Sequence, residues 1–344
     1  MQTVKTDNIL TENTDDILDI ENLHIEFRTD EGTVKAVNGL NMVIGRGKIL
    51  GLVGETGAGK TTTGLAILNL VPSPAGVVTG GRILLDGIDI LPQKDKQMER
   101  IRGKIVSMIF QDPMTSLNPV QTVEQQIAEV IEHHERLGKA NSLEKAREML
   151  ELVGIQKERG CEYPHQFSGG MKQRVVIAIA LACNPKFLIA DEPTTALDVT
   201  IQAQVLEMIK ELRREFGMAM LMITHDLGIV ADICDDVSII YAGRIVEHGT
   251  LADVFDEPKH PYTIGLFGSL PDMENLDNRL KPIPGLMPDP TNLPPGCAFC
   301  PRCPHALGIC NEQKPEAVYF NDTHFVECYL FTDGKTNSIE QIKD

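Results

Sequence analysis

An eight-residue segment, GETGAGKT at Gly54–Thr61, constrains the fold of this 344-residue chain more than any other feature. It contains two glycines separated by four residues and followed by Lys60 and Thr61. In this pattern the glycines let backbone N–H groups turn inward around a phosphate, the lysine reaches the outer phosphates, and the hydroxyl group can ligate magnesium. Because the apolar run Ile49–Val53 precedes the segment and a helical pattern follows it, we predict a phosphate-binding loop between a strand and a helix. The residues expected to bind phosphate are Gly54, Glu55, Thr56, Gly57, Ala58, Gly59, Lys60, Thr61 and Thr62.

Short apolar runs alternate with amphipathic stretches along the rest of the chain, and this alternation predicts an α/β fold. Besides Ile49–Val53, strands are predicted at Ile105–Phe110, Phe187–Ala190, Ala219–Ile223 and Val237–Tyr241. Strands that are almost wholly apolar are typical of a parallel sheet covered by helices on both faces. Two helical patterns, Val123–Arg136 and Leu143–Val153, follow one another with no strand between them, which indicates a helical insertion at about residues 112–184.

A second motif consists of two acidic residues, Asp191 and Glu192, directly after the apolar run Phe187–Ala190. Because a parallel sheet binds ligands beyond the carboxyl ends of its strands, we expect both side chains beside the phosphate loop. Asp191 is predicted to hold magnesium, directly or through water, and Glu192 to polarise the attacking water as general base. Alone, such a pair is as often a solvated strand end, but together with Gly54–Thr61 it indicates nucleotide hydrolysis.

A third motif, FSGGMKQR, places a Ser-Gly-Gly turn at the start of a predicted helix. Such a turn presents a hydroxyl group, backbone N–H donors and the positive end of a helix dipole, and so suits an anion. An ordinary glycine-bearing helix start is the alternative. At these residues the chain resembles the ATP-binding cassette (ABC) family, whose signature is Leu-Ser-Gly-Gly-Gln. Ser168, Gly169 and Gly170 match that signature, whereas Phe167 and Met171 replace its Leu and Gln.

The resemblance extends to three further motifs in the family's order. Gln111, in IFQDP, matches the glutamine loop that senses magnesium and water and touches the membrane partner. His225, in ITHD, matches the switch histidine that hydrogen-bonds the γ-phosphate and the attacking water. Ala196, Leu197 and Asp198 match the loop that crosses the dimer interface. A motif of one residue is usually structural, but the ordered set supports the resemblance.

The resemblance implies a fold and a reaction. The fold is an ABC-type P-loop nucleotide-binding domain with a RecA-like core, an antiparallel β subdomain and a helical insertion. The reaction is hydrolysis of ATP by water, in a dimer where each site combines one chain's P-loop with the other chain's Ser-Gly-Gly turn. The implied catalytic residues are Glu192, His225, Gln111 and Lys60, and the implied magnesium ligands are Thr61, Gln111 and Asp191.

The aromatic residue that stacks on adenine is expected near the first strand pair. Phe27 is the predicted residue, although a slip of six or seven positions is open because Arg28–Thr33 resembles a loop insertion.

The charge of the chain bounds its partners. With 49 acidic and 32 basic residues the formal net charge is -17, which argues against nucleic acid as a bulk partner. We expect residues 1–16 to form an acidic flexible tail with no secretory region, and the chain to stay in the cytosol. The longest apolar run, Val175–Cys183, is far shorter than the ~20 residues that a spanning helix needs.

Five of the eight cysteines lie in one short region and indicate a metal site in a reducing compartment. These residues are Cys297, Cys300, Cys303, Cys310 and Cys328. The spacing leaves zinc and an iron-sulfur cluster about equally supported, with free thiols a distant third. The other three, Cys161, Cys183 and Cys234, are predicted to be buried small hydrophobic residues.

The end of the chain resembles the C-terminal extension of peptide-uptake ABC ATPases of the dipeptide, oligopeptide and nickel type. The match includes HPYT at His260–Thr263 and the pattern Gly-Cys-x-Phe-x3-Cys beginning at Gly296. The resemblance implies a [4Fe-4S] cluster on Cys297, Cys303, Cys310 and Cys328, with Cys300 as a possible substitute. We therefore predict an ATPase domain over residues 17–256 and a small, irregular, Cys-rich domain over 257–344.

Two classes of function are compatible with this set of motifs. The first is the ATP-hydrolysing subunit of an importer for di- and oligopeptides, on the cytoplasmic face of the membrane. Its implied partners are two permease subunits, a homologous second ATPase and, indirectly, a solute-binding protein; nickel or sugars are alternative cargoes. The second is a soluble ABC ATPase of ribosome recycling or iron-sulfur assembly. The recycling factors carry two fused cassettes and an N-terminal cluster, so the single P-loop and C-terminal cysteines favour the importer.

Overall fold

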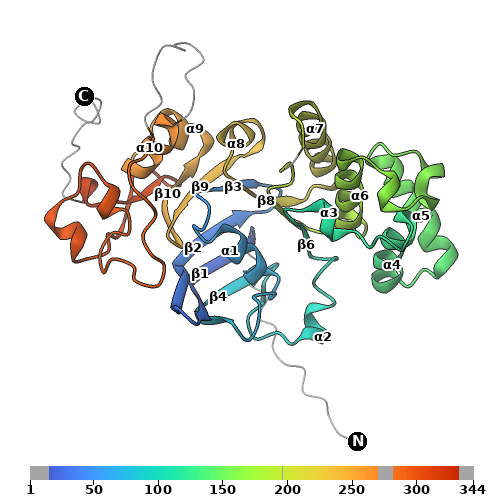
Figure 1. The fold of residues 1–344 in the computed structure, drawn as a ribbon, viewed down its shortest axis with the longest axis horizontal. Coiled ribbons are helices and arrows are strands. Elements are labelled where there is room, and N and C mark those ends of the chain that lie inside the picture. Colours follow the sequence, from blue (N-terminus) through green and yellow to red (C-terminus); the bar gives the residue numbers. More distant parts are fainter. Residues whose placement is uncertain (1–14, 196, 270–281, 333–344) are drawn as a thin grey trace, which may run out of the picture.

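A computed structural model describes residues 15–195, 197–269 and 282–332 of the chain. The predicted tail at 1–16 lies almost wholly outside the described residues, and so does Ala196. The described part contains two β-sheets flanked by helices, with the C-terminal segment and the helical insertion at opposite ends of the molecule (Figure 1).

The larger sheet has eight strands in the order β11-β12-β10-β9-β3-β8-β7-β6. Five neighbouring strands are parallel and run from the middle of the sheet to its edge at β6: β9 (Asp236–Tyr241), β3 (Ile49–Val53), β8 (Ala219–Thr224), β7 (Phe187–Asp191) and β6 (Val106–Ile109). These strands confirm the five that were predicted. Strand β10 (Arg244–Thr250) continues the sheet antiparallel to β9.

Successive residues of the central strands enter two different cores, which explains why these strands are apolar throughout. In β7, Leu188 and Ala190 belong to a core shared with the helices, whereas Phe187 and Ile189 belong to a core shared with the smaller sheet. The helices outside the insertion are α1 (Lys60–Ile67), α2 (Asp95–Met98), α7 (Val199–Phe216), α8 (Leu227–Ile233), α9 (Leu251–Asp256) and α10 (Pro261–Gly268).

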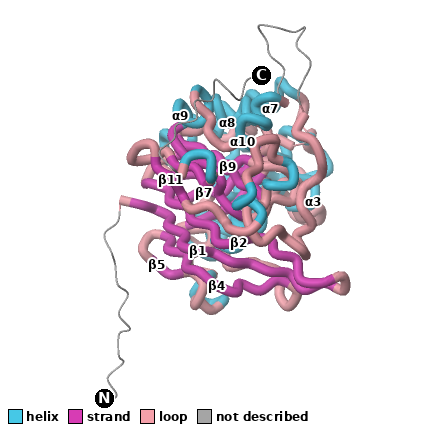
Figure 2. The backbone as a smooth tube through the Cα atoms, turned by 90° about the vertical axis from the view of Figure 1, so that its left-hand side faces the viewer, coloured by secondary structure: helices cyan, strands magenta, loops and turns pink. Residues whose placement is uncertain are grey.

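The smaller sheet is antiparallel, with the order β2-β1-β4-β5 (Figure 2). Its strands are β1 (Asp16–Thr29), β2 (Gly32–Gly45), β4 (Gly76–Leu85) and β5 (Ile88–Asp89). Strands β1 and β2 form a long hairpin in which Thr29 pairs with Gly32. The region that resembled a loop insertion, Arg28–Thr33, is therefore the tip of this hairpin.

The helical insertion lies between β6 and β7 and confirms the predicted pair of consecutive helices. It contains α3 (Pro113–Ser116), α4 (Val123–Glu135), α5 (Lys139–Leu152) and α6 (Gly169–Leu181), with 3-10 turns at Lys157–Cys161 and Pro164–Gln166. Ile127 and Ile131 of α4 and Leu150 of α5 are fully buried in the core that these helices share with the larger sheet.

The C-terminal segment continues the larger sheet beyond the boundary predicted near residue 257. Its strands β11 (Ala317–Tyr319) and β12 (Phe325–Glu327) extend the larger sheet, because β12 pairs with β10. Its 3-10 helices are Cys300–Arg302, Gly308–Asn311 and Tyr329–Phe331. The composition changes at the predicted boundary, but the core does not end there.

Aromatic rings join this segment to the core of the larger sheet. The ring of Phe299, which is 2% exposed, lies 5.3 Å from the ring of Tyr241 in β9 and 5.4 Å from that of Tyr262 in α10. The fully buried carboxylate of Glu247 in β10 accepts backbone N–H groups from Lys259 at 2.7 Å and His260 at 2.9 Å. Sheet, helix and C-terminal segment therefore share one interior.

The three scattered cysteines differ in their environments. Cys234 is buried and Cys183 is half-buried, in line with the prediction, but Cys161 is exposed. Cys161 is the last residue of a 3-10 turn, and its thiol donates to the backbone carbonyl of Glu158 in the same turn at 3.4 Å. The prediction that Cys161 is buried in a core was therefore wrong.

We predict that Phe299→Ala destabilises the whole ATPase fold. Truncating a buried Phe costs about 3–5 kcal/mol because a cavity replaces its contacts. Urea unfolding followed by circular dichroism should show one transition at lower denaturant concentration. Leu286→Ala is the control, since Leu286 is 90% exposed and its loss should change the free energy of unfolding by less than about 0.5 kcal/mol. A separate early transition, with the main one unchanged, would contradict the shared core.

Candidate functional site

The predicted functional side chains meet at the carboxyl edge of the parallel strands. Residues that follow β3, β6, β7 and β8 line one pocket of about 560 Å³. The pocket is lined by Val34, Ala36, Thr56, Gly57, Gly59, Lys60, Thr61, Thr62, Gln111, Glu192, His225 and Pro290. The edge of the sheet thus brings together four segments that are distant in sequence, and residues of β2 and the C-terminal segment complete the lining.

The phosphate-binding loop depends on two glycines at which no side chain fits. A Cβ at Gly54 would lie 2.3 Å from the carbonyl oxygen of Ile240. Gly59 has φ +101°, and its Cβ would lie 2.5 Å from the carbonyl oxygen of Ala36. Gly59 precedes α1, so the loop delivers its backbone N–H groups to the positive end of that helix, an arrangement that binds phosphate.

Lys60 is held inside the loop. The residue is only 7% exposed. Its Nζ donates to the carbonyl oxygens of Gly54 at 2.7 Å and Glu55 at 3.0 Å. Burial lowers the pKa of Lys60, although the nearby Glu192 and Asp191 oppose that shift. A phosphate in the pocket would supply the negative charge that favours the ammonium form.

Glu192 is the centre of a hydrogen-bond network. Its carboxylate accepts the Gln111 side-chain amide at 2.8 Å and the Thr195 hydroxyl at 2.9 Å, and His225 Nδ1 lies 2.8 Å from its second oxygen. Burial alone would raise the pKa of Glu192, but the hydrogen bonds from His225 and Thr195 hold it below the ordinary value. The group is therefore an ionised carboxylate at neutral pH, as a general base requires. Its backbone has φ 46°, an uncommon conformation for a residue with a side chain.

Asp191 is suited to hold magnesium. It is 2% exposed, and burial raises the pKa of its carboxyl group while a hydrogen bond with Thr61 opposes the shift. Thr61 is the second residue of α1 and lines the pocket, so a carboxylate and a hydroxyl oxygen lie together beside the phosphate loop. Oxygen donors of this kind fit Mg²⁺, whose charge would also keep Asp191 ionised.

The signature residues do not line this pocket. Ser168 precedes α6, where it makes no capping hydrogen bond, and Gly169 begins the helix. A Cβ at Gly170 would lie 2.5 Å from the side chain of Ile201. The turn is thus packed against α7, apart from the chain's own phosphate loop.

The loop before α7 also lies outside the pocket lining. Asp198 caps α7 by accepting the backbone N–H of Ile201 at 3.0 Å, and Leu197 packs against the larger core. Ala196 lies outside the described residues.

Phe27 does not lie where the sequence predicted. It is paired with Val34 across the β1–β2 hairpin, and its ring lies against Gly76 of β4, so it packs in the core of the smaller sheet. Val34 and Ala36 of β2 and Pro290 of the C-terminal segment form the apolar wall of the pocket instead. Because side chains alternate between the two faces of a strand, the sequence of β2 could have indicated that Val34 and Ala36 share a face. Nothing in the sequence around Pro290 indicated that it lines the pocket.

An ion pair that the sequence did not indicate joins the phosphate loop to the C-terminal segment. Arg302 and Glu55, 247 positions apart, form a two-pronged contact with distances of 2.7 Å and 3.1 Å. The Arg302 side chain is only 6% exposed, and Nη1 also donates to the Tyr241 hydroxyl at 3.3 Å. The Glu55 backbone N–H donates to the Tyr262 hydroxyl at 3.0 Å. Glu55 is thus positioned by the C-terminal half while its carbonyl holds Lys60.

The five clustered cysteines meet in the fold but do not form a metal site as they are placed. Together with His260 and His305 they line a cavity of about 20 Å³. Burial raises the pKa of Cys297 to about 11 and that of Cys328 to about 12. Within the described residues, no three His, Cys, Asp or Glu side chains are arranged to hold a metal ion. The donor set therefore does not fit the predicted cluster or zinc in this arrangement.

Comparison with protein families gives two matches. The ABC transporter family model matches residues 37–195, which include the phosphate loop, the signature turn and Glu192. The model for the C-terminal region of oligopeptide/dipeptide transporters matches residues 246–310. The first match covers the phosphate loop through Glu192, and the second includes four of the five clustered cysteines.

Several curated proteins are similar over nearly their whole length. The oligopeptide transport ATP-binding protein OppD of Bacillus subtilis (strain 168) is 50% identical over 317 residues, covering 91% of this chain and 88% of OppD. The dipeptide transport ATP-binding protein DppD of the same organism is 48% identical, covering 91% of this chain and 94% of DppD. OppD of Salmonella typhimurium is 48% identical over 301 residues, covering 87% and 89%.

Solved structures match the cassette part of the chain. The dimeric post-hydrolysis state of the ATP-binding cassette MJ0796 with ADP and Pi has a TM-score of 0.62 at 25% identity, covering 68% of this chain and 98% of that one. The structure of cbiO1 from Clostridium perfringens, part of the cbiONQ ABC transporter complex, has a TM-score of 0.60 at 29% identity, covering 74% and 96%.

The Arg302–Glu55 pair is expected to position the phosphate loop. Arg302→Met should lower the free energy of unfolding by about 1–3 kcal/mol, because it leaves a partly buried carboxylate without its counter-charge. It should also raise the Kd for Mg-ATP about fivefold, a change of about 1 kcal/mol. Urea unfolding and calorimetric titration measure the two effects.

A double-mutant cycle separates the pair from general damage. Arg302→Met combined with Glu55→Gln should lower the free energy of unfolding by clearly less than the sum of the two single changes. The coupling free energy should be about 1 kcal/mol. Arg100→Met, at an exposed position, removes the same charge and should leave both quantities unchanged. Strict additivity of the two changes would show that the contact does not position the loop.

Proposed function

Because the chain belongs to the family of ABC transporter ATP-binding proteins, in the branch of oligopeptide and dipeptide transport proteins, we propose that it hydrolyses ATP to power uptake of di- and oligopeptides through a membrane importer. The observation that carries this proposal is the network in which Gln111, His225 and Thr195 hold the Glu192 carboxylate at the edge of the phosphate loop. This network supports hydrolysis, and the similarity to peptide transport proteins over 91% of the chain supports the cargo class.

Each residue of the pocket has a separate role in the proposed hydrolysis. The loop N–H groups and Lys60 bind the phosphates and stabilise negative charge on the transferring phosphoryl group. Glu192 accepts a proton from the attacking water, and His225, whose side chain is 65% exposed, reaches both Glu192 and the γ-phosphate side of the pocket. Gln111 orients the same carboxylate. When bound, Mg²⁺ would neutralise phosphate charge, held by Thr61, Asp191 and Gln111.

A second ATPase chain completes each site in this proposal. The exposed Ser168 and Gly169 lie outside the chain's own pocket, which suits a head-to-tail pairing in which they face the nucleotide of the partner. Asp198 at the start of α7 would lie at the same interface. The partner is proposed to be a homologous chain, with a homodimer as the simpler variant.

The remaining partners are two permease subunits and, indirectly, a solute-binding protein. No helix in the described part of the chain is both long and apolar enough to cross a bilayer. We place the chain at the cytoplasmic face of the membrane, docked to the permeases through the helical insertion and the Gln111 loop. Closure of the ATPase pair on ATP and its opening after hydrolysis would drive transport.

The cysteine-rich segment carries a finer proposal, a [4Fe-4S] cluster on Cys297, Cys303, Cys310 and Cys328, with Cys300 as substitute and zinc as the alternative. What supports it is the common cavity that all five thiols line. Because their present placement is not that of a metal site, binding would require the thiols to converge and lose their protons. No step of ATP hydrolysis depends on it.

We predict that Glu192→Gln abolishes hydrolysis but not binding. The amide keeps the shape of the side chain but cannot accept the proton of water, so kcat should fall at least 100-fold, the usual contribution of a general base. Mg-ATP should still bind, and an ATP-bound dimer should accumulate in size-exclusion chromatography.

Glu207→Gln is the matched control, because Glu207 is exposed on α7 and should leave hydrolysis unchanged. Continued turnover by Glu192→Gln would mean that another group is the base.

Transport itself is tested with purified importer. An affinity-tagged chain is isolated from membranes, the co-purifying permeases are identified, and the complex is placed in proteoliposomes with labelled di- and oligopeptides. ATP-dependent peptide accumulation that Glu192→Gln removes supports the proposal. Recovery of ribosomes without integral membrane proteins, or uptake of nickel or sugar but not peptide, would overturn it.

The cluster is tested independently of transport. Anaerobically purified protein should be brown and contain about four irons per chain. Replacing Cys303 and Cys310 by Ser should remove both colour and iron, whereas Cys183→Ser should not. A colourless protein loaded with zinc, or one without metal, would exclude the cluster.

A further inference from the structure

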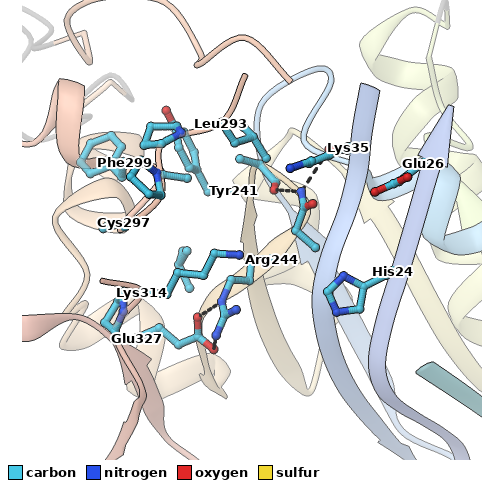
Figure 3. Close-up of a pocket in the computed structure, with 18 residues that line it drawn as sticks. His24, Glu26, Lys35, Tyr241, Arg244, Leu293, Cys297, Phe299, Lys314 and Glu327 are labelled. Carbon is cyan, nitrogen blue, oxygen red and sulfur yellow. Dashed lines mark hydrogen bonds and ion pairs between the residues drawn. The ribbon is translucent and has the colours of Figure 1, made fainter. Parts of the chain in front are cut away.

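A second cavity, separate from the phosphate pocket, lies where the smaller sheet, β10 and the C-terminal segment meet (Figure 3). Its volume is about 290 Å³, and it shares no lining residue with the phosphate pocket. Its wall is formed by β1 and β2 on one side and by residues 293–299 and 314–315 on the other.

Basic side chains from three separate elements line this cavity. Lys35 comes from β2, Arg244 from β10, and Lys314 from the segment before β11. Figure 3 shows the Arg244 guanidinium turned toward the carboxylate of Glu327, with Lys314 beside it, Lys35 above and His24 at one side. Only Arg244 has a charged partner, Glu327, whose Oε1 lies 3.1 Å from Nη2. Among the described residues, no ion pair is formed by Lys35 or Lys314.

The basic groups repel one another, but Lys35 and Lys314 are solvent-exposed and two carboxylates lie in the same cavity. Burial and the nearby Arg244 and Lys35 lower the pKa of Lys314, and Glu327 opposes this shift. Burial, Lys314 and Arg244 lower the pKa of His24, and Glu26 opposes this shift. An anion between the basic groups would relieve this repulsion.

The wall also includes the carboxylates of Glu26 and Glu327 and the polar side chains of Asn38 and Tyr241, and its other residues are mostly apolar. Val246, Leu293, Pro294, Pro295 and Phe299 line the cavity. Its volume is at the lower end of the range for pockets that hold drug-sized molecules. A cavity with basic groups at one side and proline and aliphatic surface at the other suits a small molecule with one anionic group and an apolar body.

We propose that this cavity binds a small organic oxyanion, whose carboxylate or phosphate lies between Lys35 and Lys314 and whose apolar part contacts the proline-rich wall. Lysine ammonium groups bind either oxyanion as point charges. Such a ligand would bridge β2 of the ATPase core and the C-terminal segment.

The bound anion would be coupled to the nucleotide pocket. In β2, Val34 and Ala36 line the phosphate pocket, whereas Lys35 between them lines this cavity. The Lys35 backbone N–H donates to the carbonyl of Pro290 at 2.9 Å, and Pro290 also lines the phosphate pocket. The two cavities therefore lie on either side of one strand, and an anion that orders Lys35 should change nucleotide affinity, with the reciprocal effect of nucleotide on the anion.

The test is calorimetric titration of the full chain with two anions that each have one anionic group and an apolar body, hexanoate and phenyl phosphate. Saturating Mg-ADP blocks the phosphate loop, and hexanamide and phenol are the matched neutral compounds. We expect at least one anion to bind and both neutral compounds to fail, with binding weakened by added salt. The two arms distinguish a carboxylate site from a phosphate site.

Three variants assign the binding to the cavity. Lys35→Met with Lys314→Met should weaken the anion at least tenfold, whereas Lys35→Arg with Lys314→Arg should retain it. Lys96→Met, at an exposed position on α2, removes a charge elsewhere and should bind as the parent does. Failure of both anions to bind the parent, or equal binding by the Met double variant, would overturn the proposal. Hydrolysis by the parent, measured in parallel, reports on the proposed function separately.

Discussion

The common direction of the central strands is the constraint on which the candidate site depends. Because β3, β6, β7 and β8 are parallel, the residues that follow them leave the sheet at one edge. That edge collects the phosphate loop, Gln111, Glu192 and His225 into one pocket without any of them being close in sequence. Reversing one strand would send its functional residue to the opposite edge of the sheet.

The C-terminal segment adds a second constraint on the same loop. It extends the larger sheet, places Phe299 in the core and pairs Arg302 with Glu55 of the phosphate loop. Because Arg302 has little access to water, it depends on Glu55 for its counter-charge. Arg302 lies in the cysteine-lined segment and contacts Glu55, whose backbone carbonyl accepts a hydrogen bond from Lys60. A structural change in that segment can therefore move Lys60 by moving Glu55.

Sequence patterns predicted the parts of this structure that are local. The strands are confirmed because residues buried on both faces leave an uninterrupted apolar run, and the helices between β6 and β7 because their periodicity is continuous. Sequence patterns did not indicate the long-range packing. Phe27 is partly buried against the core of the smaller sheet, and β12 pairs with β10 across the predicted change in composition near residue 257.

By itself, the sequence determined the α/β class and the phosphate-loop motif, and it singled out Glu192 and His225 as candidates, because each signal depends on a few neighbouring residues. Tertiary structure alone decided the pairing of Arg302 with Glu55, the apolar wall at Val34 and the basic cavity beside β2. These features join segments separated by most of the chain. Contacts of that kind are determined by how sheets and core pack, and no local spacing of residues records them.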